Sequence, residues 1–439
     1  MTSLILRGRL LSFKRAPTAR DDAASYHYEP DGAVLIVDGE IRTSGSYGEV
    51  IEAAEDGVPE IDHRPHLIMP GFIDTHLHFP QMQVIGSYAA NLLEWLNTYT
   101  FIEEQRFADS GHAAHIATHF FDEMVRHGTT TAAAYCSVHK ASADAYFAEA
   151  MKRNMLMIGG KVMMDRNAPE GLRDTPQQGY DETRQVIADW HGKGRNHVAI
   201  TPRFAITSTP EQMEVAKTLA AEFPDLHIQT HLSENREEIE FTCSLYPDAK
   251  DYTDIYDRYG LLGRKSLFGH CIHLSDREAD VMSESGSVAV HCPTSNLFLG
   301  SGLFPLRHLQ NREKPVRVSF ATDIGGGTSY SMLRTLDEAY KIQQLLGERL
   351  NPLKSFYFAT RGNAEALSLT DRIGTLDDGT DADLIVLDAS ATPAMALKMQ
   401  AVKTLSEELF LLQTMGDDRA IVETYVAGQP MKSTIGRPA

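Results

Sequence analysis

Two histidines one residue apart, His76 and His78, close an apolar stretch that reads MPGFIDTHLHFPQ. Residues i and i+2 of a β-strand point to the same side, so both imidazoles could face one site at the end of a strand. Imidazole is a common ligand of Zn²⁺ and other transition metals. The pair alone leaves a structural or surface role open, because histidine also occurs at strand ends without a metal.

Three further residues of the metal-binding kind end other apolar stretches: His231 in IQTHLSEN, His270 in LFGHCIHL and Asp323 in SFATDIGGG. Three or four imidazoles with one carboxylate suit zinc, and iron(II) or manganese on ligand type alone. Each residue taken singly could be a hydrogen-bonded core histidine or a turn aspartate. Their joint occurrence at strand ends predicts one metal site.

Glu234 follows His231 by three residues, where a strand should give way to a loop. A carboxylate beside a metal could take a proton from metal-bound water and deliver it to a leaving group. The alternative is a glutamate at a helix N-terminus, where it favours the helix dipole, a role that Glu237 and Glu238 could also play.

The elements that must position these residues begin at Leu67, where apolar strands start to alternate with longer amphipathic segments. Eight strands are predicted, at residues 67–78, 129–136, 155–165, 197–206, 227–234, 266–272, 287–295 and 316–323. This pattern predicts the α/β class and a TIM-like (β/α)8 barrel, which places its chemistry at the C-terminal ends of its strands. Thr209 and Ser275 each begin a predicted helix with a capping box.

The two ends of the chain have a different character. Short strands with glycine- and aspartate-rich turns, such as Asp38-Gly39, occupy the N-terminal and C-terminal parts. Neither part alone has enough strands to bury a face. We therefore expect one discontinuous small β-sandwich domain, built from residues 1–67 and 371–439, beside a barrel at residues 68–370.

The composition narrows the class of partner. Among 439 residues, 41 are basic and 60 acidic, which gives a net charge of −19, and this charge argues against nucleic acid and anionic membranes. The four cysteines form no Cys-x-x-Cys pair, so neither a disulfide framework nor a thiolate zinc site is indicated. No stretch reaches the roughly 18 apolar residues of a membrane span. We expect a cytoplasmic protein.

Five motifs in a fixed order carry a family resemblance: PGFIDTHLHFPQ, THLSEN, GHCIHLSD, HCPTSN and ATDIGGG, between residues 70 and 327. The set resembles the amidohydrolase superfamily and, within it, the guanine deaminases, while RIGTLDDGTDADLIVLD resembles the closing β domain of that superfamily. The resemblance implies a barrel with a β-sandwich, one zinc per subunit with iron as the alternative, and a homodimer. It assigns the metal to His76, His78, His231, His270 and Asp323, and makes Glu234 the proton shuttle.

The reaction implied by the resemblance is the hydrolysis of guanine to xanthine and ammonia. Zinc lowers the pKa of bound water towards neutrality, so hydroxide is available to attack the ring carbon. Glu234 would pass the proton of water to the purine, Asp323 would accept a proton and orient the hydroxide, and His270 would polarise the substrate. Guanine and water are then the small-molecule partners.

The resemblance also assigns base binding to Gln81, Arg203 and Phe204, with His231 counted among the residues that contact the substrate. The Gln81 amide offers a donor and an acceptor, and the Arg203 guanidinium could donate to the oxygen and nitrogen acceptors of guanine. The alternatives are a turn glutamine, a surface ion pair and, for Phe204, a core aromatic. Trp95 could close the site, form a subunit contact or simply pack.

Two rival functions stay open at this point. A related amidohydrolase with the same metal site could act on another purine, a pteridine, cytosine or a chlorotriazine. A non-catalytic relative that serves as a scaffold would be expected to lack ligands. The chain has all five ligand candidates and Glu234, which favours an enzyme.

Overall fold

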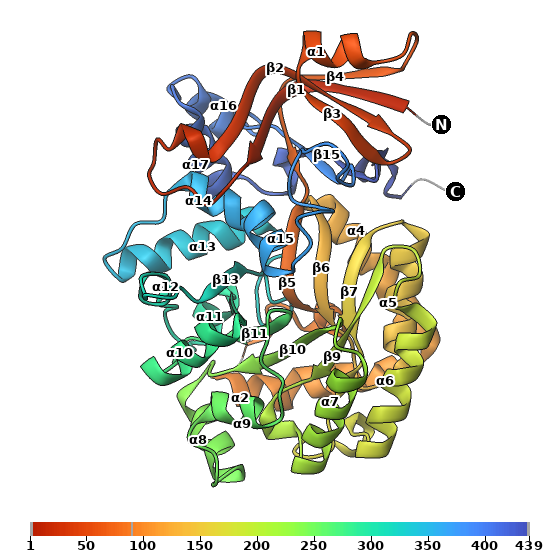
Figure 1. Cartoon of the computed structure of the whole chain (residues 1–439), viewed down its shortest axis with the longest axis vertical. Coiled ribbons are helices and arrows are strands. Elements are labelled where there is room, and N and C mark those ends of the chain that lie inside the picture. Colours follow the sequence, from red (N-terminus) through yellow and green to blue (C-terminus); the bar gives the residue numbers. More distant parts are fainter. Residues whose placement is uncertain (1–2, 89–90, 437–439) are drawn as a thin grey trace.

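Eight parallel strands form the central barrel of the computed structural model, which describes residues 3–88 and 91–436 (Figure 1). In ring order they are β5 (Phe72–His78), β6 (Thr129–Tyr135), β7 (Leu156–Gly160), β9 (Asn196–Pro202), β10 (His227–Leu232), β11 (Ser266–His270), β12 (Val288–His291) and β13 (Arg317–Phe320). A two-residue strand, β8 (Val162–Met163), pairs with β9. Each of the eight predicted barrel segments contains one of these strands, but residues 67–70 belong to the other sheet and residues 293–295 begin a helix.

The ring closes between β13 and β5 through hydrogen bonds at the ends of these strands. The Thr75 hydroxyl lies 2.8 Å from the hydroxyl of Ser319, and the backbone N–H of Asp323 donates to the carbonyl oxygen of His76 at 2.9 Å. The second bond connects the first barrel strand to the turn after the last one. It therefore joins the backbones of two residues that are predicted to bind the same metal.

Helices cover the outside of the barrel and connect its strands (Figure 1). Those between the strands are α4 (Ser110–Arg126), α5 (Lys140–Lys152), α6 (Pro176–Trp190), α7 (Pro210–Glu222), α8 (Arg236–Leu245), α9 (Tyr252–Arg258), α10 (Asp276–Ser285), α11 (Pro293–Phe298) and α12 (Leu306–Gln310). After the last strand follow α13 (Met332–Leu345), α14 (Pro352–Tyr357) and α15 (Asn363–Ala366). Every residue of β5, β6 and β7 is buried, as expected for strands covered on both faces.

Two short helices after β5 cross the C-terminal end of the barrel: α2 (Leu92–Trp95) and α3 (Phe101–Gln105). Asn91 caps α2, because its side chain accepts the backbone N–H of Glu94. The connection between them, Leu96–Thr100, is a π-helical turn. This segment carries Trp95 and Glu104, whose side chains are both buried.

The two predicted helix starts differ in their caps. Ser275 forms the full capping box of α10 with Glu278. At α7, the Thr209 side chain accepts the backbone N–H of Gln212, but the reciprocal bond is absent, because Asp165 accepts the N–H of Thr209 at 2.8 Å. The predicted box at Thr209 is therefore wrong in its second half, since the carboxylate of Asp165 takes the place of the Gln212 side chain.

Both ends of the chain contribute to a second sheet, drawn above the barrel in Figure 1. Its order is β16-β15-β14-β4-β1-β2-β3, with bounds β1 (Ser3–Phe13), β2 (Tyr26–Val37), β3 (Glu40–Ser46), β4 (Glu60–Pro70), β14 (Leu384–Leu387), β15 (Ile421–Val426) and β16 (Gln429–Pro430). All of these strands except β16 contribute to one buried apolar cluster, which contains residues from both ends of the chain. The β unit built from both termini is confirmed. Helices α1 (Tyr47–Ala53), α16 (Pro393–Met399) and α17 (Leu405–Met415) accompany it.

The predicted hairpin joins β2 to β3, with Asp38 and Gly39 at φ values of 51° and 90°, as a two-residue hairpin turn requires. β4 runs on to Pro70 and pairs there with β14, so the sheet continues past residue 67. The domain boundaries at residues 67 and 370 stay a prediction.

A buried arginine joins the barrel to the terminal sheet. Arg195, which directly precedes β9, donates to Asp381 at 2.8 Å and to Asp383 at 2.5 Å.

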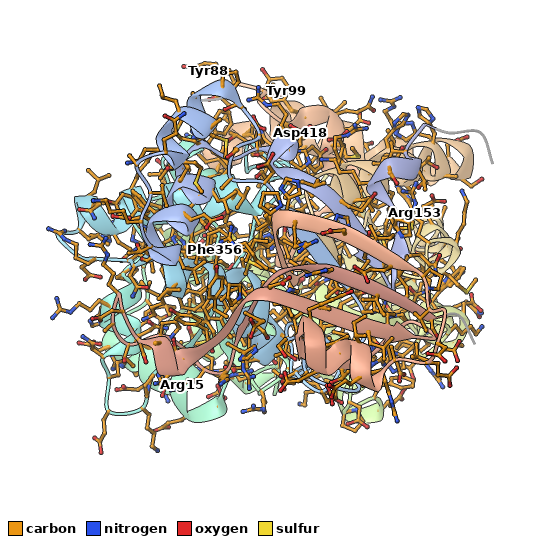
Figure 2. The ribbon with its side chains drawn as sticks, turned by 90° about the horizontal axis from the view of Figure 1, so that it is seen from above. Arg15, Tyr88, Tyr99, Arg153, Phe356 and Asp418 are labelled. Atoms are coloured by element: carbon orange, nitrogen blue, oxygen red, sulfur yellow. The ribbon has the colours of Figure 1, made fainter. Side chains whose placement is uncertain are left out.

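Figure 2, a view from above, shows Phe356 in the interior and Tyr88 at the outer edge, in keeping with side chains that are 0% and 82% exposed. Within the described residues, no helix is long and apolar enough to cross a membrane.

Candidate metal centre and active site

The predicted metal ligands converge at the C-terminal end of the barrel. His76 and His78 lie on β5, His231 lies on β10, His270 ends β11 and Asp323 follows β13 by three residues. The backbone at His270 and Asp323 has φ values of 72° and 51°. Non-glycine residues adopt positive φ at a cost of about 1 kcal/mol or more, and such residues gather at functional sites.

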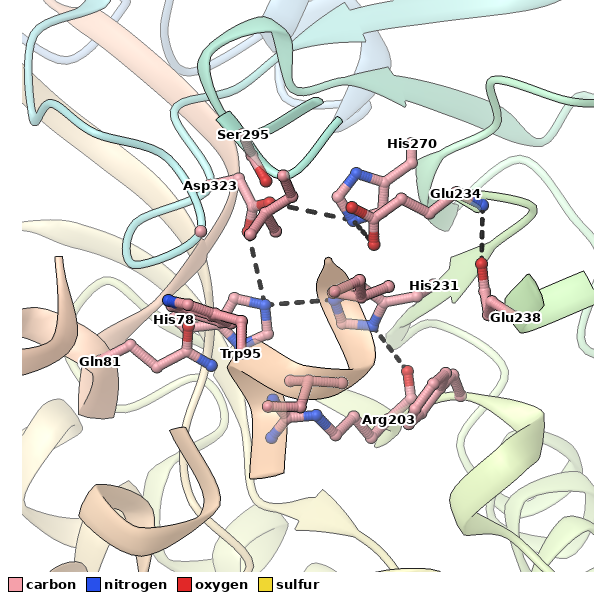
Figure 3. A pocket seen from close by; sticks show the side chains of 15 residues that line it. His78, Gln81, Trp95, Arg203, His231, Glu234, Glu238, His270, Ser295 and Asp323 are labelled. Atoms are coloured by element: carbon pink, nitrogen blue, oxygen red, sulfur yellow. Dashed lines mark hydrogen bonds and ion pairs between the residues drawn. The ribbon is translucent and has the colours of Figure 1, made fainter. Parts of the chain in front are cut away.

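The side chains of His78, His231, His270 and Asp323 meet around one point (Figure 3), and the His76 ring lies beside Asp323. Asp323 Oδ1 lies 3.3 Å from His76 Nε2 and 3.5 Å from His78 Nε2, and Asp323 Oδ2 lies 3.8 Å from His270 Nε2. His78 Nε2 is 3.1 Å from His231 Nε2. Ligand atoms fall within 4.8 Å of one another in two overlapping groups: His76, His78 and His231, and His76, His270, Cys292 and Asp323.

The protonation of these side chains fits a divalent cation. Burial holds the pKa values of His78, His231 and His270 well below the ordinary histidine range, so these rings are neutral and have a lone pair to offer. Burial would raise the pKa of Asp323, but the adjacent imidazoles, His76 first, outweigh it and leave the pKa below its usual value. Both ring nitrogens of His76 are buried and lack a hydrogen-bond partner among the described residues. A cation would satisfy Nε2, the ring nitrogen that faces Asp323.

Contacts behind the ligands orient the rings. The Nδ1 of His231 lies 2.7 Å from the carbonyl oxygen of Arg203, which can only accept a hydrogen bond, so Nδ1 carries the proton and Nε2 is free to bind metal. The side-chain amide of Asn296 lies 2.9 Å from His270 Nδ1, which leaves His270 Nε2 facing Asp323. Asp74 lies two residues before His76 on the same strand. Its side chain accepts a hydrogen bond from the backbone N–H of Thr322 at 3.1 Å and so anchors the turn that carries Asp323.

Glu234 lies beside this cluster and outside the following helix. Its Oε2 is 3.3 Å from His270 Nε2, and its Oε1 accepts the hydroxyl of Ser301 at 2.8 Å. Burial, the nearby Glu238 and Asp323 raise its pKa well above the ordinary glutamate value, as suits a group that takes up and releases a proton near neutral pH. Because Asn235 caps helix α8 and Glu237 and Glu238 occupy its first turn, the helix-dipole alternative does not describe Glu234.

The three predicted base-binding residues line one cavity, which His78, His231, Glu234, His270 and Asp323 also line. Arg203 is 3% exposed and Phe204 5% exposed, so Arg203 is not a surface ion-pair former. Gln81 lies in the turn after β5, where its Oε1 accepts the backbone N–H of Gly325 at 3.3 Å. Trp95 also lines the cavity and is 2% exposed, so its side chain is part of the wall and not of the outer surface.

Four residues of this region were not singled out from the sequence: Glu104, Cys292, Asn296 and Ser301. Cys292 and Asn296 lie in the quoted motif HCPTSN, which could have drawn attention to them. Burial raises the pKa of the Cys292 thiol well above its usual value, so the thiol stays protonated. The imidazoles and the carboxylate are therefore the groups that can bind a metal without first losing a proton. Glu104 gives no spacing signal, because its partners Gln81 and Arg203 are 23 and 99 residues away.

A barrel of this kind with such a cluster at its C-terminal end defines a class of hydrolase, and the chain belongs to the amidohydrolase family, whose model matches residues 67–431. The guanine deaminase of Escherichia coli (strain K12) is 45% identical over 425 residues, which cover 97% of this chain and 96% of that protein. The solved structure of E. coli guanine deaminase superposes with a TM-score of 0.94 at 43% identity, over 98% of this chain and 99% of the other.

A second solved structure, guanine deaminase from C. acetobutylicum with guanine bound in the active site, has a TM-score of 0.86 at 30% identity and covers 98% of this chain and 100% of the other. The likeness to guanine deaminases therefore extends over nearly the whole chain, the barrel and the terminal sheet alike.

Proposed function

We propose that the chain is a guanine deaminase, which hydrolyses guanine to xanthine and ammonia. The observation that carries the proposal is the single cavity on which the ligand cluster, Glu234 and the pair Gln81 and Arg203 converge. Near-full-length similarity to guanine deaminases supports it. A related enzyme that acts on another aminated heterocycle would share the metal cluster. Such an enzyme would not need two side chains that match an edge of guanine.

We also propose that His76, His78, His231, His270 and Asp323 hold one zinc ion per subunit, with iron(II) as the alternative. A divalent cation in this place supplies an acidified water and electrostatic stabilisation of negative charge that develops at the reacting carbon. Three neutral imidazoles and an ionised carboxylate support it.

The side chains then divide the proton transfers. Glu234 takes a proton from the attacking water and delivers it to the ring nitrogen beside C2. Asp323, charged and next to His270, accepts the second proton of water and returns it to the 2-amino group, which leaves as ammonia. His270 and His231 face the reacting carbon with neutral rings. Gln81 and Arg203 hold the opposite edge of the base by hydrogen bonds, and Phe204 packs on its face.

The decisive experiment incubates the purified protein with guanine and follows xanthine by its absorbance and ammonia by a coupled assay, with adenine, cytosine and an aminotriazine as comparison substrates. Xanthine and ammonia in equal amounts support the proposal. Rapid turnover of a comparison substrate without turnover of guanine would overturn it. Elemental analysis of the active protein distinguishes zinc from iron.

We make two further proposals, on the oligomeric state and the compartment. We propose a homodimer, on the family resemblance, which light scattering after gel filtration would test. We propose the cytoplasm as the compartment, since Cys136, Cys243, Cys271 and Cys292 are all free, as is usual where thiols stay reduced. Fractionation of the host cell would test the second proposal.

A further inference from the structure

A buried glutamate lies behind the wall of the cavity and contacts both proposed base-binding side chains. Glu104, on α3, is 1% exposed and is not among the residues that line the cavity. Its Oε1 accepts a hydrogen bond from Gln81 Nε2 at 2.7 Å, and its two oxygens accept from Arg203 Nη1 at 2.9 and 2.6 Å. One carboxylate therefore fixes both Gln81 and Arg203.

These bonds decide which atoms of Arg203 are left for a ligand. Glu104 engages Nη1, while Nε and Nη2 make no hydrogen bond to any residue in the described part of the chain. The guanidinium also packs on Phe101, with Cζ 5.3 Å from the ring centroid. Since a guanidinium is planar and its donors point in fixed directions, an arginine held on one edge presents the other edge as a rigid pair of donors.

Gln81 is fixed in the same way. Its Nε2 donates to Glu104 and its Oε1 accepts from the backbone of Gly325 at 3.3 Å. Because an amide has two N–H groups and an acceptor oxygen with two lone pairs, one N–H and one lone pair remain for a ligand. The carboxylate, which can only accept, decides that the nitrogen of Gln81 points towards Glu104.

Charge adds a second reason for a glutamate at this place. Arg203 is 3% exposed, and a lone buried cation would favour an anionic ligand over a neutral ring. The Glu104 carboxylate, which forms an ion pair with Nη1 at 2.6 Å, balances this charge. Arg203 and Glu104 together therefore offer strong donors at this side of the cavity without a net charge, which matches a neutral base with acceptors on one edge.

The edge of guanine opposite the reacting C2 carries O6 and N7, which are both acceptors, and a fixed arginine edge matches this pair. An adenine in the same place would present an amino group, a donor, where guanine has O6. We infer that Glu104 is the positioning residue that makes the site selective for 6-oxopurines, because it fixes and neutralises Arg203 and orients Gln81. The inference rests on the proposed function and names the feature of the substrate that is selected.

The Glu104→Gln variant tests the inference, because it keeps the shape of the side chain but places an N–H against the donors of Arg203. Two substrates are compared: guanine, and 2-aminopurine, which has the same reacting carbon and amino group but lacks O6. We expect kcat/KM for guanine to fall about 10- to 100-fold, mainly through KM, because a good bidentate contact is worth about 1–3 kcal/mol. For 2-aminopurine we expect less than about a 3-fold change.

Glu103→Gln is the matched control, since Glu103 is the adjacent residue of α3 but pairs with Arg106 and His112. This control variant should leave the ratio of kcat/KM for guanine to kcat/KM for 2-aminopurine unchanged. Bound metal and the unfolding temperature are measured for each variant. If Glu104→Gln does not fold, Glu104→Asp serves instead, because it keeps the charge but cannot reach both partners, and the same selective loss on guanine is expected.

The outcomes separate the inference from the proposed function. Equal losses on guanine and 2-aminopurine would mean a purely structural role, and unchanged rates on both would mean that Glu104 does not position Arg203. Either result overturns the inference while guanine deamination by the unaltered protein stands. If the unaltered protein does not deaminate guanine, the proposed function itself is wrong.

Discussion

The close approach of β11 to a proposed metal ligand gives a sharp test of the metal site. Gly269 directly precedes His270, and a Cβ added there would lie 2.6 Å from Cε1 and 3.0 Å from Nδ1 of His76. Non-bonded carbon atoms prefer about 3.5–4.0 Å, so the ring would have to move by about 1 Å. Gly269 does not have positive φ, so Gly269→Ala adds this contact without demanding a new backbone conformation.

The size of the effect follows from the packing. Overpacking a tight core costs about 1–3 kcal/mol. In the metal-free protein the imidazole can turn away and relieve the contact, whereas a bound metal holds it in place. The cost therefore appears as weaker metal binding, and 1.4 kcal/mol per factor of ten converts it to about 5- to 150-fold. We expect Gly269→Ala to fold and to bind zinc more weakly by this factor.

The assay is a competition for zinc between the protein and a chromophoric chelator, with circular dichroism as the test of folding. Gly48→Ala is the matched control, because Gly48 lies on exposed α1 and a Cβ there meets nothing within 4 Å. Unchanged zinc affinity in folded Gly269→Ala would refute the placement of His76 in the metal site. If the metal-free variant is unfolded, zinc is added and the recovery of structure is followed by circular dichroism, with the unaltered protein as the comparison.

Further predictions address the proton shuttle, its partner and the joint between the two sheets. Glu234→Gln should lower kcat about 10²- to 10⁴-fold with metal retained, and full activity would exclude the shuttle role. Because burial raises the pKa of Glu234 in the folded state, the metal-free protein should lose stability as pH rises from the unfolded glutamate pKa through the folded one; urea titrations should find this loss smaller in Glu234→Gln. Ser301→Ala removes the hydrogen bond that lowers the pKa of Glu234, so the acid limb of the kcat/KM profile should move to higher pH, and an unmoved limb would contradict the assignment. Arg195→Ala leaves Asp383 buried without its cation, while Asp381 keeps its ion pair with Arg372, and should cost about 3–5 kcal/mol in the free energy of unfolding, whereas the same change at exposed Arg20 should cost less than about 1 kcal/mol.

Local pattern was enough to predict the barrel and the metal cluster. His76 and His78 are two positions apart on a strand, a spacing that must bring both side chains to one face. Parallel strands of a closed barrel present all their C-terminal ends at one mouth. Once eight strands were recognised, His231, His270 and Asp323 had to meet His76 there, and the structure places them within a few ångströms of one another.

The capping of α7 marks the point at which local pattern fails. The sequence places Thr209 at the start of the helix, which is correct. The second bond of the box depends on which carboxylate or amide reaches the N–H of Thr209, and Asp165 reaches it from 44 residues away. Several side chains could accept this one N–H group. Which of them does so depends on distances in the folded chain, and these cannot be read from the sequence.

The sequence by itself predicted the barrel, a cluster of imidazoles with a carboxylate at its C-terminal end, and an acid three residues after His231. What only the tertiary structure decided is the set of contacts that tune this chemistry. Glu104 holds Gln81 and Arg203 from a helix that no periodicity ties to either, and Ser301 reaches Glu234 across 67 residues. The physical reason is that ligands on strand ends are placed by a regular repeat, whereas their supporting hydrogen bonds form wherever the folded chain brings a donor to an acceptor.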